Sequence, residues 1–213
     1  MSTKRFLPPT ALLTGCLLAA ACGATREPTS AVADFSPGTS PEYAVYAAVL
    51  DSLFARGNVR PRYVLSDSTV VVPIPASAEW PIALRTDKFG PLLADAVNAT
   101  LPSFRTRSAE RVALRAADLR PRGSVELVSA TDLLALRGTG GGPREFWRSF
   151  YARFPGAAGS IAVSRVGFDD QGTHALLYVS HGCGALCADG GFVLVERRGE
   201  RWVVLKYLVT WVS

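Results

Sequence analysis

The alternation of residues in the last third of the chain constrains the fold most strongly. Runs rich in β-branched and aromatic residues occupy 160–168, 173–181, 190–197 and 201–212. They are separated by short polar connections or by glycine-containing loops. Because connections of this kind join neighbouring antiparallel strands, the pattern predicts a four-stranded meander.

The expected register of this meander makes both faces of the sheet apolar. We expect Phe168 to pair with Thr173, and Arg197 to pair with Glu200. The larger apolar residues then share one face: Ile161, Val163, Leu176, Tyr178, Phe192, Leu194, Val203, Leu205 and Tyr207. A sheet that is apolar on both faces must be covered on both. We expect the N-terminal helices to cover one of these faces. The other face carries Trp202 and Lys206, which predict a pocket for an acidic or amphipathic ligand.

The rest of the chain supplies the helices and two further strands. Ser40 and Pro41 are typical of a helix start, and apolar residues then recur at helical intervals. Helices are expected at 41–56, 89–100 and 108–119 and after Pro143, and strands at 62–73 and 125–129. The fold class predicted for 41–213 is therefore a single α+β domain, with N-terminal helices packed on a curved antiparallel sheet.

This order of elements resembles the cone-shaped fold of the nuclear-transport-factor-2 kind. The resemblance concerns the architecture of residues 41–213 and depends on no sequence motif. Folds of this kind support both enzymes and binding proteins, so the resemblance implies an architecture and leaves the activity open.

The first 22 residues have the three zones of a secretory signal peptide. Lys4 and Arg5 form a basic start, residues 6–18 an apolar middle, and Ala19–Ala21 a small-residue segment before Cys22. A cysteine directly after such a segment resembles the lipobox of bacterial lipoproteins. The resemblance implies that Cys22 carries diacylglycerol and becomes the first residue of the mature protein.

Two neighbouring features refine this prediction. Leu13–Cys16 forms a second possible lipobox, which makes Cys16 the alternative lipidation site. Gly23 follows Cys22 where an aspartate would retain a lipoprotein at the inner membrane, so the resemblance implies an outer-membrane anchor. Residues 23–40 are rich in small, polar and proline residues, which predicts a flexible tether.

Cys183 and Cys187 lie in the loop between two predicted strands. In an exported protein, two cysteines this close most often form a disulfide. If Cys183 faces Cys187 across the turn, the same hairpin pairs Tyr178 with Phe192, as the expected core face requires. The sequence therefore predicts a structural disulfide.

The same loop allows two sharper hypotheses. His181 lies two residues before Cys183, so both side chains point to one face of a strand. His181, Cys183 and Cys187 could then bind a metal, resembling copper chaperones that use a Cys-x-x-x-Cys pair with a histidine. Alternatively, the cysteine pair could be redox-active.

Composition and motifs narrow the function only partly. The chain has 23 basic and 18 acidic side chains, and its arginines are spread along the chain without forming a basic stripe. This distribution argues against a nucleic-acid partner. The sequence has no P-loop, dinucleotide fingerprint, Gly-x-Ser-x-Gly or His-Glu-x-x-His motif, so no cofactor is expected.

Three functions remain open. The first is a non-catalytic, lipid-anchored envelope protein that binds a small ligand or a partner protein. The second is a hydrolase or isomerase with a pocket under the sheet. The third is a metal or thiol-redox protein that uses His181, Cys183 and Cys187.

Overall fold

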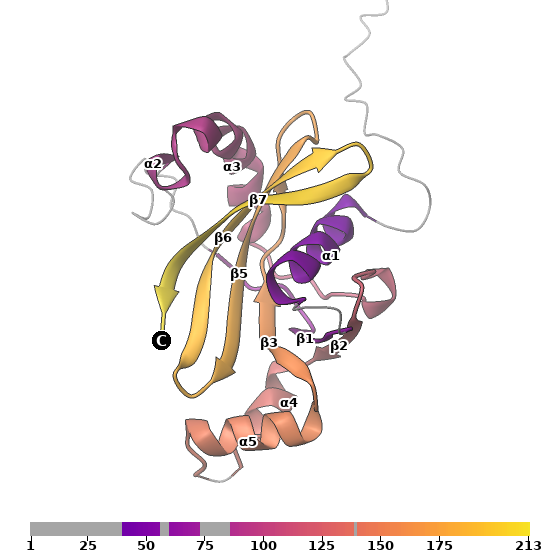
Figure 1. The fold of residues 1–213 in the computed structure, drawn as a ribbon, viewed down its shortest axis with the longest axis vertical. Coiled ribbons are helices and arrows are strands. Elements are labelled where there is room, and N and C mark those ends of the chain that lie inside the picture. Colours follow the sequence, from indigo (N-terminus) through magenta and orange to yellow (C-terminus); the bar gives the residue numbers. More distant parts are fainter. Residues whose placement is uncertain (1–39, 56–59, 73–85, 139) are drawn as a thin grey trace, which may run out of the picture. The chain divides into compact units, whose positions relative to one another are not determined.

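The protein is described here by a computed structural model covering residues 40–55, 60–72, 86–138 and 140–213. All of these residues belong to one unit of the chain, Phe35–Ser213. The predicted leader, with Cys16 and Cys22, lies outside the described residues, as does the predicted tether up to residue 39. The described part is an α+β fold with helices on both faces of an open sheet, which confirms the predicted fold class (Figure 1).

The bounds of the elements are as follows. The helices are α1 (Pro41–Phe54), α2 (Thr86–Phe89), α3 (Ala94–Ser108), α4 (Ala130–Ala135) and α5 (Pro143–Arg153). The strands are β1 (Arg62–Ser66), β2 (Ser124–Val128), β3 (Ala157–Val163), β4 (Gly167–Phe168), β5 (His174–Gly184), β6 (Cys187–Arg198) and β7 (Arg201–Val212). Short 3-10 turns occupy Pro91–Leu93 and Ala116–Asp118.

The strands form one mixed sheet in the order β2-β1-β3-β5-β6-β7, with β4 pairing with β5. Strand β1 runs parallel to both β2 and β3, whereas the pairs from β3 to β7 are antiparallel. The predicted meander is therefore confirmed, and the parallel strands at the other edge make the sheet mixed.

The helices agree with the sequence at the start of the domain and differ in the middle. Helix α1 begins at Pro41 as expected and ends at Phe54. Helix α3 begins later than predicted and continues through Pro102 to Ser108. The helix expected at 108–119 is wrong: this segment contains a β-bridge at Ala113 and a single 3-10 turn.

The first hairpin of the meander differs from the expected register, because Phe168 pairs with Ala175 and not with Thr173. Val163 pairs with Val179 and not with Tyr178, because the ladder breaks between β3 and β4. A one-residue shift moves a side chain to the opposite face of a sheet. Ile161 and Val163 therefore pack with Leu177 on the face covered by α1.

The last hairpin also differs from the expected register. Arg197 pairs with Trp202 and not with Glu200, so the two-residue turn consists of Gly199 and Glu200. Gly199 has a φ of +62°, as such tight turns require. Farther along, a β-bulge at Leu205 places Lys206 opposite Leu194. Tyr207 consequently packs on the α1 face, while Leu205 stays with Leu194 on the other face.

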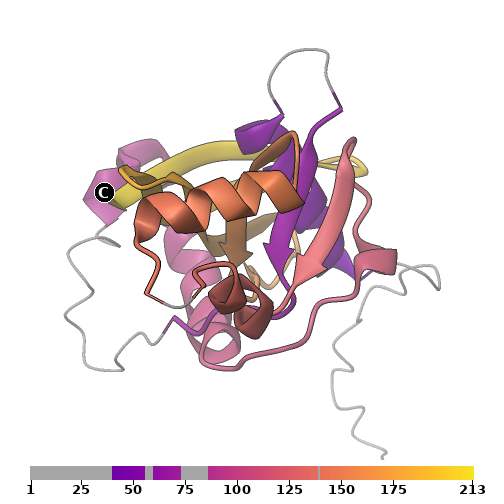
Figure 2. The same cartoon turned by 90° about the horizontal axis from the view of Figure 1, so that it is seen from below.

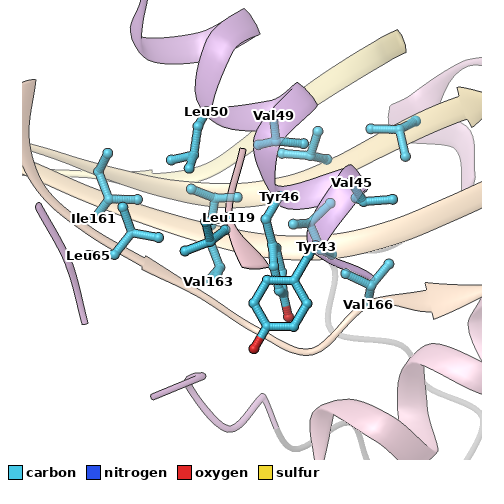
Figure 3. Close-up of a cluster of buried hydrophobic side chains, with 14 of the residues drawn as sticks. Tyr43, Val45, Tyr46, Val49, Leu50, Leu65, Leu119, Ile161, Val163 and Val166 are labelled. Atoms are coloured by element: carbon cyan, nitrogen blue, oxygen red, sulfur yellow. The ribbon is translucent and has the colours of Figure 1, made fainter. Parts of the chain in front are cut away.

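Two hydrophobic clusters lie on opposite faces of the sheet. In the first, α1 packs its buried side chains onto β3, β5 and β6, and Figure 3 shows Val49 and Leu50 facing the strands. In the second, Phe104 and other residues of α3 pack onto Leu176, Phe192 and Leu194. Helices thus cover both faces, although the sequence predicted helices on only one.

A third cluster lies beside the parallel strands. It is formed by Val64 of β1, Val128 of β2 and the aromatic side chains of α5 and the residue after it, Phe150 and Phe154. Figure 2 shows α5 lying across this end of the sheet, with α4 close to it. Helix α5 thereby carries Trp147 to the edge of the β5–β6 hairpin, next to Gly182.

Candidate functional site

The β5–β6 hairpin carries the disulfide predicted from the sequence. Cys183 and Cys187 are bonded to each other, with their Cα atoms 5.1 Å apart. Gly184, and not Cys183 as expected, pairs with Cys187, so the turn contains two residues and Cys183 is the bulged residue of the ladder. Below the turn, Tyr178 pairs with Phe192 as expected.

Reduction of this disulfide should lower the free energy of unfolding by about 2 kcal/mol, because the bond closes a short loop. Urea unfolding with and without dithiothreitol measures the difference. The double variant Cys183→Ser/Cys187→Ser should match the reduced protein and show no response to the reductant. Identical midpoints for oxidised and reduced wild-type protein would mean that the bond adds no stability to the fold.

His181 makes contacts through both ring nitrogens. Nδ1 lies 3.3 Å from Oδ1 of Asp189, and Nε2 lies 2.7 Å from the carbonyl oxygen of Ala158. The ring packs against Phe54, with the two ring centroids 4.8 Å apart. Each ring nitrogen of His181 therefore lies close to an oxygen atom of the protein, one in a side chain and one in the backbone.

Asp189 links this histidine to the next strand. Its other carboxylate oxygen accepts a hydrogen bond from the hydroxyl of Tyr207. Burial, followed by this hydrogen bond, raises the pKa of Tyr207 above its usual value. The group formed by His181, Asp189 and Tyr207 therefore connects β5, β6 and β7 on the α1 face of the sheet.

The three residues of the metal hypothesis lie together, but their sulfur and nitrogen atoms already have partners within the protein. His181, Cys183 and Cys187 line one cavity of about 420 Å³, together with Leu53 and Phe54 of α1. The two sulfur atoms are bonded to each other, so neither is a thiolate ligand. Within the described ranges, no group of three His, Cys, Asp or Glu side chains could hold a metal ion.

A larger groove of about 760 Å³ lies between α1 and the start of β7. Its size is within the range of roughly 300–1,000 Å³ that is typical of small-molecule sites. Ala44, Ala47 and Ala48 of α1 line one side, and Trp202 and Val204 of β7 line the other. Together, these five apolar side chains form the apolar part of the groove lining, which we call its floor.

The predicted pocket residues Trp202 and Lys206 are separated by the bulge in β7. Trp202 is half-buried, lines the groove and packs against Phe168, with ring centroids 5.8 Å apart. Lys206 is exposed and pairs with Leu194, whose side chain packs against α3, so it does not line the groove.

Charged side chains from other segments surround the floor instead. They are Asp51, Asp118, Arg120, Arg122, Glu200 and Arg201. Arg120 and Arg122 follow the segment 108–119, which was wrongly expected to be helical. Their position beside Trp202 was therefore not predicted.

A third cavity, which the sequence did not predict, lies between α5 and β7. Trp147 of α5 and Trp211 of β7 flank a shallow cavity of about 270 Å³, whose floor consists mainly of small residues of the sheet. A side chain on Gly182 would lie 3.1 Å from the ring of Trp147, and one on Gly190 would lie 2.3 Å from Nε1 of Trp211. These two glycines lie two rungs apart in the β5–β6 hairpin, and their lack of side chains leaves room for the two tryptophan rings.

Comparisons with known proteins give no family assignment. No family model matches the chain, and no curated protein or solved structure matches it either. None of the helices in the described ranges is long and apolar enough to cross a bilayer.

Proposed function

We propose that this protein is an exported lipoprotein, anchored to the outer membrane by lipid on Cys22. We further propose that it is a non-catalytic binding module whose ligand occupies the groove between α1 and β7. One observation carries the second proposal: the groove combines an apolar floor with a polar rim in a cavity of ligand size. The enzyme alternative receives less support, because the ring nitrogens of His181 both face hydrogen-bond acceptors.

Two features support the location outside the cytosol. The leader has the zones of a signal peptide followed directly by Cys22. The disulfide between Cys183 and Cys187 is of a kind that persists in oxidising compartments and is rare in the cytosol. A tether between lipid and domain would let the groove work away from the membrane surface.

The anchor is tested by mass spectrometry of the protein purified from its native host. We expect the mature chain to begin at Cys22 and to carry the mass of an acylated diacylglycerol. Cys22→Ala should abolish lipid attachment and recovery in the detergent phase, whereas Cys16→Ala should change neither. Acylation at Cys16, or an intact leader without lipid, would overturn the assignment to Cys22.

The groove is tested with N-phenyl-1-naphthylamine, a neutral aromatic probe that fluoresces in apolar surroundings. We expect saturable binding with a dissociation constant on the order of micromolar. Ala47→Trp places a large ring on the half-buried floor and should abolish binding, while Ala152→Trp on the exposed face of α5 should not. Equal binding to both variants and wild type would exclude the groove as the site.

A further inference from the structure

The carboxylates at the rim of the α1–β7 groove already have cationic or hydrogen-bonding partners. Asp51 accepts hydrogen bonds from the hydroxyl of Tyr63, at 3.0 Å, and from the backbone amide of Arg122, at 2.9 Å. The guanidinium of Arg122 lies 3.7 Å from the same carboxylate. The charge of Asp51 is therefore compensated by Arg122 and by two hydrogen bonds.

The other two carboxylates are matched in the same way. Oδ2 of Asp118 lies 2.5 Å from the guanidinium of Arg115, which is not part of the groove lining. Glu200 is bonded to Arg197 at 3.4 Å, and its side chain is 93% exposed, so water screens its charge. Neither carboxylate depends on an arginine that lines the groove.

Two arginines of the groove lining remain without a carboxylate partner among the described residues. Arg120 donates a hydrogen bond to the carbonyl oxygen of the preceding residue, Leu119, at 3.3 Å. Arg201 begins β7, directly before Trp202, and is exposed. Both line the groove from opposite segments, and both guanidinium groups have donors available for an anion.

This charge distribution specifies the class of ligand. We propose that the groove binds an anionic amphiphile, with its apolar body against Trp202 and the alanines of α1. Its carboxylate, sulfonate or phosphate group would be held by Arg120 and Arg201. This inference rests on the proposed binding function and adds the chemical class of the ligand to it.

The experiment compares two probes that differ in one charged group. The first, 8-anilino-1-naphthalenesulfonate, has the ring system of N-phenyl-1-naphthylamine and carries one additional sulfonate. We expect the folded protein to bind the sulfonate at least about tenfold more tightly, because two guanidinium groups can hydrogen-bond to it. This preference should shrink as salt is added, whereas binding of the neutral probe should not weaken.

The double variant Arg120→Gln/Arg201→Gln isolates the two arginines. It should weaken sulfonate binding about tenfold and leave binding of the neutral probe unchanged. The matched control is Arg144→Gln/Arg148→Gln, which changes the net charge equally through exposed residues of α5. The control should bind both probes as the wild type does. Near-ultraviolet circular dichroism confirms that each variant is folded, since partly unfolded states also bind the sulfonate.

The outcomes separate the two proposals. If both probes bind equally and Ala47→Trp blocks both, the binding function stands and the preference for an anion is overturned. The preference is also overturned if both double variants weaken sulfonate binding equally, because net charge then explains the effect. If neither probe binds, or if Ala47→Trp blocks neither, the groove is not the site and both proposals fall.

Discussion

Replacing Glu42 with leucine should lower the free energy of unfolding by about 3–5 kcal/mol, because it leaves two partly buried arginines without their shared carboxylate. Glu42 lies in the first turn of α1, and its side chain is only 12% exposed. Its carboxylate accepts hydrogen bonds from Arg107 at 2.6 Å, Tyr46 at 3.0 Å and the amide of Val166 at 2.9 Å. Arg165 approaches it to 3.5 Å.

These contacts make Glu42 the link between three elements. Arg107 belongs to α3, while Arg165 and Val166 lie between β3 and β4. After the substitution, the guanidinium groups of Arg107 and Arg165, which are 33% and 18% exposed, would remain half-buried with less compensation. An uncompensated buried charge costs more than the ion pair itself contributes.

Urea unfolding followed by circular dichroism measures the effect, with Glu110→Leu as the matched control. Glu110 also pairs with Arg165, at 3.5 Å, but its side chain is 71% exposed. We expect this control to lose at most about 1 kcal/mol, as for other exposed ion pairs. Glu42→Gln keeps the shape of the side chain and should fall between the two. Similar losses for Glu42→Leu and Glu110→Leu would contradict the role assigned to the buried carboxylate.

The same contacts explain which parts of the sheet could be predicted. The β5–β6 hairpin was predicted with its core pairs and its disulfide, because its pairing follows from a short local turn. The β3–β5 register was not predicted correctly, because the amide of Val166 donates a hydrogen bond to Glu42 instead of continuing the ladder. In addition, the hydroxyl of Ser164 accepts a hydrogen bond from the amide of Tyr178. Such a break depends on residues remote in sequence, which periodicity does not reveal.

The candidate groove was predictable to a similar extent. Trp202 could be placed on a face of the sheet because the alternation of β7 is regular at its start. The face of Lys206 could not be predicted, because the bulge at Leu205 depends on how β7 packs against β6 and the helices. Arg120 and Arg201 come together only when the segment after α3 reaches the start of β7. Their presence in one groove therefore depends on the tertiary structure and could not be predicted from sequence periodicity.

Stability should fall steeply above pH 10, because Tyr46 and Tyr63 keep their protons in the folded state and lose them on unfolding. Both residues are almost fully buried, at 1% and 0% exposure. Burial, followed by the charge of Glu42, raises the pKa of Tyr46. Burial, followed by the hydrogen bond to Asp51, raises the pKa of Tyr63.

The sign follows from proton linkage. Below an unfolded-state pKa of about 10, both states carry the tyrosine protons and stability does not depend on them. Above it, the unfolded state binds fewer protons than the folded state, so the free energy of unfolding decreases as pH rises. Each tyrosine contributes about 1.4 kcal/mol per pH unit, so Tyr46 and Tyr63 together contribute about 2.7, and Tyr207, whose pKa is also raised, adds to the slope.

Urea unfolding at intervals from pH 8 to pH 11 gives this slope directly. Tyr46→Phe loses hydrogen bonds to Glu42 and to the carbonyl of Ser164, so it should be less stable than wild type at pH 8. Its slope above pH 10 should nevertheless be shallower by about 1.4 kcal/mol per pH unit, because one linked proton is gone. The two stability curves should therefore approach each other as pH rises, and Tyr63→Phe should behave in the same way. Parallel curves for wild type and both variants would show that these hydroxyls ionise equally in the folded and unfolded states.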